Sequence, residues 1–237
     1  MVYQRKRGKS GAALREAMIG AAFRVVEQKG ADAINAVAIC RKFGVSQTAS
    51  YAHFPDGVTE LLGAVAIRGF DRLRGALDKS SSATGAEDSP RRVFLDYVRF
   101  GLEFPNLYRA MFSPRLAPKL AAVNVAARDS LKRDRTYREL LMVKAMAYEA
   151  FVSPMQALRR ASVTGSSNPG DAEKAVATLA HGLVLEFIDE GIDLGTTTED
   201  SRLTDRLAMA SRLLEMVLYG VLRDRAGPAA QRRPDER

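Results

Sequence analysis

The first quarter of the sequence contains a run of short or hydrogen-bonding side chains. Gln47 can pair with the edge of adenine through its amide, Thr48 can bond to a base or a phosphate, and Ala49 leaves room for a thymine methyl group. Tyr51 and His53 are suited to contacts with phosphate oxygens. A helix with a purely structural role more often carries Glu and Lys on its exposed face. These side-chain types therefore favour contact with nucleic acid.

Three short helices are predicted to position this run. The first spans about 12–29 and stops at Gly30, which is a natural C-terminal stop. The second spans about 36–43, where the side chain of Asn35 can cap the helix N-terminus. The third follows within a few residues, so the three helices are expected to form one compact unit.

The turn between the second and third helices is tight. Gly44 lacks a Cβ and permits the left-handed backbone that such a turn uses. Ser46 can cap the third helix, which runs to about residue 53 or 54 before Pro55 and Gly57 break the pattern. The arrangement is that of a helix-turn-helix. Many structural hairpins share this spacing, so the spacing alone leaves a purely structural role open.

Positive charge is concentrated near the N-terminus. The chain has a formal net charge of +8, and residues 1–57 hold nine Lys or Arg residues against four acids, which is +5 in the first quarter. Such a field attracts polyanions, of which nucleic acid is the commonest, although it could equally serve solubility. A basic arm precedes the first helix and could reach a phosphate or the minor groove through Arg5, Lys6, Arg7 and Lys9.

The whole pattern predicts an all-α protein, because no stretch alternates convincingly with a period of two. We predict an N-terminal DNA-binding domain over 1–57, a connecting helix over 58–79, a larger helical domain over 80–224 and a disordered tail over 225–237. Beyond the connecting helix, further helices are predicted over 90–104, 106–113, 116–133, 136–162 (with a kink at Ser153 and Pro154), 170–190 and 199–224.

Composition argues against several classes of protein. The single cysteine, Cys40, allows no intramolecular disulfide, and two histidines without a second cysteine make no credible zinc site. The sequence has no phosphate loop, nucleophile elbow or convincing catalytic cluster, so we expect no enzyme, cofactor or metal. We also expect a cytoplasmic protein, because no export signal is evident and no apolar run reaches the roughly 20 residues that span a bilayer.

The stretch ICRKFGVSQTASYAHFPDGVTELL resembles the signature of the TetR family of transcription regulators. The resemblance covers about residues 12–75 and is carried by Ile39, Cys40, Gly44, Val45, Ser46, Tyr51, His53, Phe54, Leu61 and Leu62. It implies that Gln47 and Thr48 read bases while Tyr51 and His53 hold phosphates. It also implies an obligate homodimer on double-stranded operator DNA, with a small-molecule effector bound in the second domain and repression relieved by that effector.

Two positions depart from the family pattern. The family usually has Lys where this chain has Gly57, so one phosphate contact is expected to be missing. Position 50 is commonly a large apolar residue and here is Ser50. DNA affinity is therefore expected to be modest. The alternative is a helical ligand-binding or interaction protein that has lost operator binding.

The stretches LYRAMF (107–112) and AHGLVLEF (180–187) resemble the C-terminal domains of one branch of these regulators. Candidate residues for an apolar effector pocket, each of which could instead be ordinary core, are Tyr108, Met111, Met142, Met146, Phe151 and His181. The last two predicted helices carry wide apolar faces, which would make a four-helix dimer interface through Leu183, Phe187, Leu213, Leu214, Val217 and Leu218.

Overall fold

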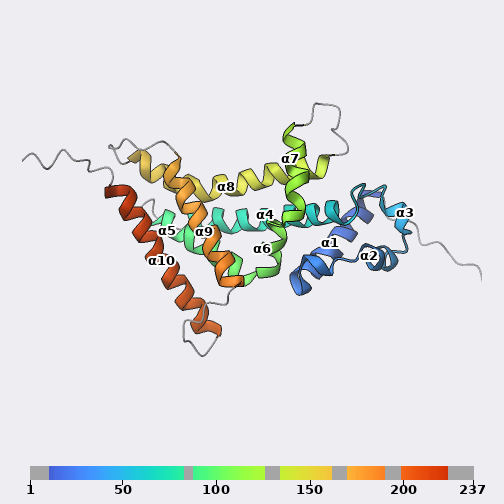
Figure 1. Ribbon diagram of the computed structural model, residues 1–237, viewed down its shortest axis with the longest axis horizontal. Helices are drawn as coiled ribbons and strands as arrows, with labels where there is room; N and C mark the ends of the chain where they lie inside the picture. The colour runs from blue at the N-terminus through green and yellow to red at the C-terminus, as the bar shows by residue number, and fades with distance from the viewer. Residues whose placement is uncertain (1–10, 83–87, 126–133, 162–169, 190–198, 224–237) are drawn as a thin grey trace, which may run out of the picture. The chain divides into compact units, whose positions relative to one another are not determined.

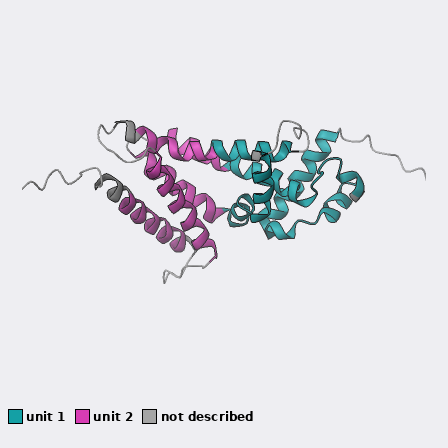
Figure 2. Cartoon of the chain, turned by 45° about the horizontal axis from the view of Figure 1, so that its top comes forward, with its two compact units in different colours: residues 1–72, 104–146 teal, residues 73–103, 147–237 magenta. Residues whose placement is uncertain are grey.

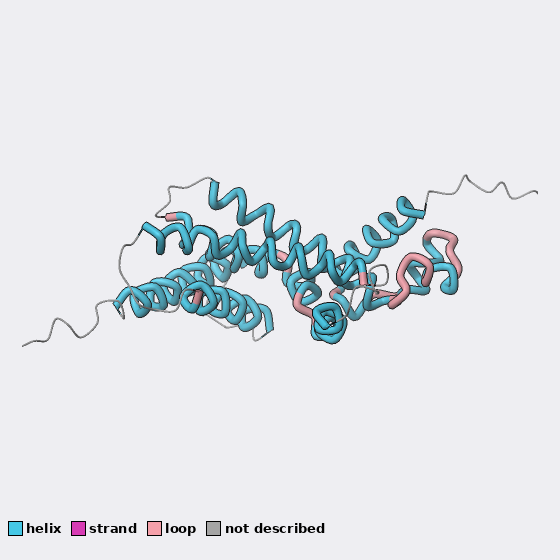
Figure 3. Tube along the Cα trace, turned by 90° about the horizontal axis from the view of Figure 1, so that it is seen from above, coloured by secondary structure: helices cyan, strands magenta, loops and turns pink. Residues whose placement is uncertain are grey.

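A computed structural model describes residues 11–82, 88–125, 134–161, 170–189 and 199–223 (Figure 1). Within these ranges the regular elements are all helices, and the tube in Figure 3 contains no strand, so the all-α prediction is confirmed. The helices are α1 Gly11–Lys29, η1 Ala31–Ala33, α2 Ala36–Lys42, α3 Gln47–Ser50, α4 Val58–Ser82, α5 Ser89–Glu103, α6 Pro105–Met111, η2 Pro114–Leu116, α7 Ala117–Val125, α8 Arg135–Ala161, α9 Asp171–Asp189 and α10 Glu199–Arg223.

Most predicted helix ends lie within a few residues of the observed ones. The third helix is the exception: α3 is a single turn, and residues 51–53 continue it as turns instead of a helix. Pro154 lies inside α8, which continues to Ala161. The predicted C-terminal part of the 116–133 helix and the predicted tail over 225–237 lie outside the described residues.

The chain forms two compact units that interleave along the sequence (Figure 2). Unit 1 contains residues 1–72 and 104–146, and unit 2 contains residues 73–103 and 147–237. The segments predicted from the sequence follow one another along the chain, and a connecting helix over 58–79 leads into the larger helical domain at residue 80. A single boundary of that kind does not describe these units, since 104–146 belong with the N-terminal helices.

Unit 1 has an apolar core made by α1, α4, α6 and the start of α8. The fully buried side chains include Met18 of α1, Leu62 of α4, Tyr108 of α6 and Leu140 of α8. Helices α4 and α6 approach closely at Gly69, where an added Cβ would lie only 2.5 Å from Cγ of Met111. This tight packing gives the short N-terminal helices a rigid support.

Unit 2 is a bundle in which α5, α9 and α10 pack against one another. A Cβ added to Gly101 of α5 would lie 2.2 Å from Cγ1 of Val184, so glycine allows α5 and α9 to come together there. The rings of Tyr97 and Phe151 meet edge to face with centroids 4.9 Å apart. No helix among the described residues is both long and apolar enough to cross a membrane.

Candidate nucleic-acid interface

The turn that joins α2 to α3 depends on local hydrogen bonds. Gly44 has a φ of +66°, in the left-handed region that favours glycine. The backbone N–H of Val45 donates to the carbonyl of Cys40 at 3.0 Å and closes the turn. Ile39 and Cys40 are buried, which anchors α2. The predicted helix-turn-helix geometry is therefore present.

Ser46 caps α3 as predicted, because its Oγ accepts from the N–H of Ala49 at 3.1 Å. The capped turn leaves Thr48 and Ala49 exposed, and the Tyr51 side chain is 50 % exposed. Ser50 lies on the opposite side and is buried, so it belongs to the packed face of the turn. The side chain of Gln47 and the predicted arm residues Arg5, Lys6, Arg7 and Lys9 lie outside the described parts.

His53 lies next to the first residue of α1. A Cβ added to Gly11 would be 3.5 Å from His53 Cε1, and the His53 side chain is half-buried. The basic arm joins the chain at Gly11. The structure therefore brings the start of α1 close to the segment that carries Thr48 and Tyr51.

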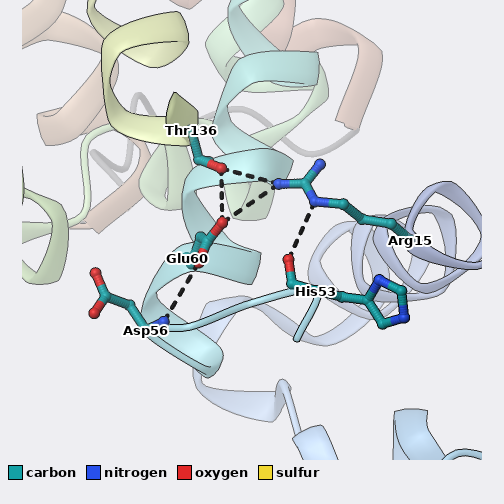
Figure 4. Close-up of polar contacts among 5 residues, drawn as sticks. All are labelled: Arg15, His53, Asp56, Glu60 and Thr136. Atoms are coloured by element: carbon teal, nitrogen blue, oxygen red, sulfur yellow. Dashed lines mark hydrogen bonds and ion pairs between the residues drawn. The ribbon is translucent and has the colours of Figure 1, made fainter. Parts of the chain in front are cut away.

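A buried polar cluster, here called the Glu60 cluster, holds this region together (Figure 4). Nη2 of Arg15 donates to Thr136 Oγ1 at 2.9 Å and lies 3.5 Å from Glu60 Oε1. Thr136 in turn donates to Glu60 Oε1 at 2.8 Å. The N–H of Asp56 donates to Glu60 Oε2 at 3.3 Å, and Arg15 Nε donates to the carbonyl of His53 at 3.2 Å.

The Glu60 cluster joins α1, α4, α8 and the turn between α3 and α4. Glu60 is only 5 % exposed, and a buried carboxylate is tolerated when it is paired and hydrogen-bonded, as this one is. This cluster was not predicted from the sequence. The sequence feature that could have indicated a buried carboxylate is the position of Glu60 directly before Leu61 and Leu62, which are both buried.

Two further groups adjoin the cluster at Asp56. Lys119 Nζ lies 2.8 Å from Asp56 Oδ2. Burial raises the pKa of the Tyr137 hydroxyl above its usual range, and the Asp56 carboxylate raises it further. The Lys119–Asp56 ion pair therefore ties α7 to the turn before α4, close to the buried phenol of Tyr137.

Gly57 directly precedes α4 and has a left-handed conformation. Its φ is +59°, and its carbonyl accepts from the N–H of Leu61 at 3.1 Å, the first hydrogen bond of α4. A Cβ added here would lie 3.6 Å from Cε1 of Tyr51. A longer side chain at position 57 would therefore start beside Tyr51.

The chain is similar in structure to several solved proteins. A protein of unknown function from Rhodococcus sp. RHA1 matches with a TM-score of 0.61 and 21 % identity, over 89 % of this chain and 98 % of that one. A bacterial regulatory protein in the TetR family from Rhodococcus RHA1 matches with a TM-score of 0.56 and 17 % identity, over 89 % and 97 %. The TetR-family transcriptional regulator PfmR from Thermus thermophilus matches with a TM-score of 0.55 and 15 % identity, over 85 % and 97 %.

The fold is that of the TetR-family regulators. No family model matches the sequence, and no curated protein is similar to it. Since the likeness extends over nearly the whole of these structures, the TetR fold accounts for both units of the chain.

Within the TetR fold, the residues predicted for an effector pocket are distributed over both units. Tyr108 and Met111 are buried in unit 1, whereas Phe151 is buried in unit 2 and His181 is half-buried there. Met142 and Met146 on α8 are exposed, by 58 % and 43 %. They lie off the buried stripe of this helix, which is made by Tyr137, Leu140, Val143, Ala147 and Phe151. The effector pocket stays a prediction.

The residues predicted for the dimer interface lie on α9 and α10. Three of them are already covered within the chain, namely Leu183, Phe187 and Leu214. Leu213 and Val217 are half-buried, and the side chain of Leu218 lies outside the described part. Met216, which was not predicted, is 68 % exposed on α10. The dimer also stays a prediction.

Proposed function

We propose that this chain is a sequence-specific DNA-binding transcription regulator, and that it acts as a homodimeric repressor controlled by a small-molecule effector. The observation that carries the proposal is the capped turn of α3, which leaves Thr48, Ala49 and Tyr51 exposed in a helix-turn-helix. Exposed groups of these types can contact base edges and phosphates without displacing core side chains.

The charge and the packing of unit 1 support the same proposal. The chain carries a net charge of +8, with an excess of basic residues in its first 57 positions. The Glu60 cluster fixes the backbone at His53 and Asp56, so the α3 region is held in one orientation before DNA is met. A preorganised surface of this kind is what selective binding requires.

The homodimer and the effector are the finer parts of the proposal. Half-sites one helical turn apart require a two-fold protein, and α10 offers Met216 on an exposed face for a second copy. Helix α4 is continuous, with residues up to Arg72 in unit 1 and from Leu73 in unit 2. An effector that displaced the second part of α4 would act on the first, and operator DNA would change effector affinity by the same factor.

The test is fluorescence anisotropy with the DNA that flanks the chain's own gene and with random DNA of equal length. Gln47→Ala is expected to lose about 1–3 kcal/mol on the cognate site and to relax the preference at one base pair. Tyr51→Phe is the matched comparison, because a lost phosphate contact should weaken both DNAs by a similar factor.

Two outcomes would count against the proposal. Equal losses on cognate and random DNA for both variants would contradict the separate roles of Gln47 and Tyr51. Absence of binding to any DNA at low salt would favour the alternative, a helical ligand-binding or interaction protein that has lost operator binding. Gly57 is the observation that supports this alternative, since the family usually has Lys there.

A further inference from the structure

A pocket of about 580 Å³ opens in unit 1 beside the C-terminal end of α1. This volume lies within the range of about 300–1,000 Å³ that is usual for small-molecule sites. The pocket is formed by the end of α1, η1, α6 and η2. Its polar side chains, here called the α1–α6 pocket residues, are Lys29, Asp32, Asn106, Arg109, Ser113 and Arg115.

The charge of the pocket is unbalanced. Three cations, Lys29, Arg109 and Arg115, face one acid, Asp32. Arg115 Nη2 lies 2.8 Å from Asp32 Oδ1, but both side chains are mostly exposed, so water and ions screen this pair. A ligand's anionic group can therefore replace Asp32 in this pair, and the residues that line the pocket include two more cations than acids.

The backbone at this end of α1 does not oppose an anion as strongly as a bare helix C-terminus would. The carbonyl of Val26 accepts from the N–H of Gly30 at 2.8 Å, and the carbonyl of Glu27 accepts from Asn106 Nδ2 at 3.2 Å. These hydrogen bonds offset part of the negative charge that collects at a helix C-terminus. The cationic side chains are left to set the local field.

The pocket is separate from the candidate nucleic-acid interface. Helix α1 has 19 residues, and its other end, at Gly11, adjoins His53. At about 1.5 Å per residue the two ends are about 28 Å apart. The cations of the pocket therefore do not belong to the surface that carries Thr48 and Tyr51. None of the residues predicted for the effector pocket lines it either.

We propose that the α1–α6 pocket binds a small organic dianion, such as a phosphate monoester or a polycarboxylate. The guanidinium groups of Arg109 and Arg115 match the paired oxygens of either group, and Lys29 adds a point charge. Asn106 and Ser113 supply hydrogen-bonding groups for the uncharged body of the ligand. The proposal goes beyond the regulator function and does not require that the chain bind DNA.

The test is isothermal titration calorimetry on the full chain at low salt. Glucose 6-phosphate serves as the phosphate probe, succinate as the dicarboxylate probe and glucose as the uncharged control. One or both anions are expected to bind, with one molecule per chain, and glucose is not. Arg109→Gln and Lys29→Gln are each expected to weaken binding by about tenfold or more, as the loss of a charge-assisted hydrogen bond implies.

The matched control is Arg92→Gln, which removes the same charge from an exposed position on α5 in unit 2. It is expected to leave anion affinity unchanged. The melting temperature of each variant checks that the chain has folded, and Arg115→Gln provides a third, independent substitution in the pocket. The proposal is overturned if neither anion binds, if glucose binds as well as the anions, or if Arg92→Gln weakens binding as much as the pocket variants do.

Discussion

The two ends of α1 are held in different ways. At the Gly11 end, Arg15 enters the Glu60 cluster, in which a nearly buried carboxylate has charged and neutral hydrogen-bond partners. At the Lys29 end, Asn106 donates to the carbonyl of Glu27 and Arg72 Nη1 pairs with the Glu27 carboxylate at 2.8 Å, while the charged side chains around the pocket are largely exposed. The first end is fixed by interactions that are costly to break, and the second has room and charge for a ligand.

The two ends of α1 should therefore tolerate substitution unequally. A buried charge that loses its partner is destabilised by the full cost of its burial, whereas an exposed ion pair contributes little. Substitutions at the Gly11 end should therefore affect folding first, and substitutions at the Lys29 end should affect ligand binding first. Glu60→Ala and Asn106→Ala test this comparison directly, and Gly57→Lys tests the turn that adjoins the Gly11 end.

The largest effect is expected from Glu60→Ala. It removes the carboxylate that Thr136 and Asp56 N–H contact, and it leaves Arg15 without its acidic partner. The loss of the ion pair with Arg15 and of the two hydrogen bonds to the carboxylate should together lower the free energy of unfolding by about 3 kcal/mol. Urea denaturation followed by circular dichroism measures it.

The matched control for Glu60→Ala is Glu16→Ala, also on an acid that pairs with an arginine. Glu16 Oε2 lies 2.7 Å from Arg68 Nη2, but both side chains are exposed. This loss should be at most about 1 kcal/mol. Similar losses for the two variants would mean that the Glu60 cluster does not fix the Gly11 end.

A smaller effect is expected from Asn106→Ala at the other end of α1. The substitution removes the hydrogen bond to the carbonyl of Glu27, so the free energy of unfolding should fall by about 1 kcal/mol. The same urea experiment measures it. A loss as large as that of Glu60→Ala would reverse the comparison, because the Lys29 end would then be held as firmly as the Gly11 end.

The smallest effect concerns Gly57, which lies beside Tyr51. Gly57→Lys adds a cation, and if position 57 faces the DNA backbone, the plot of log affinity against log salt should steepen by about 0.9. Affinity should rise equally for cognate and random DNA, since phosphate contacts carry no base information. Anisotropy titrations at several salt concentrations measure the slope.

The φ of +59° makes Gly57→Ala the necessary control, because any side chain at this position is strained by about 1 kcal/mol. Both variants share that strain, and only the lysine adds charge. Equal salt slopes for the two variants would place position 57 away from DNA.

Local features of the fold could be predicted from the sequence. The caps at Asn35 and Ser46 bond to N–H groups three residues ahead, so their spacing predicts where α2 and α3 begin. The turn at Gly44 could also be predicted from the sequence, because glycine adopts the left-handed backbone conformation without a steric penalty. The short length of α3 could not be predicted, since residues 51–53 carry no residue that breaks a helix.

Contacts between distant segments could not be predicted. Glu60 and Thr136 are far apart in the sequence, and neither residue type by itself indicates a partner. Helix α8 has apolar side chains on two faces. One face carries Leu140 and Val143, and the other carries Met142 and Met146, so the apolar pattern alone does not decide which face packs inward. The α1–α6 pocket likewise could not be predicted, because its charged residues come from two segments, 29–32 and 106–115, that are distant in the sequence.

The interleaving of the two units has a consequence for synthesis on the ribosome. Unit 1 needs residues up to Met146, so the N-terminal helices emerge long before α6 and the start of α8 can cover them. At roughly 5–20 residues per second, the interval between Arg72 and Met146 lasts several seconds. During that interval the apolar sides of α1 and α4 are exposed to chaperones and to neighbouring nascent chains, and residues 73–103 of unit 2 are made before unit 1 can finish folding.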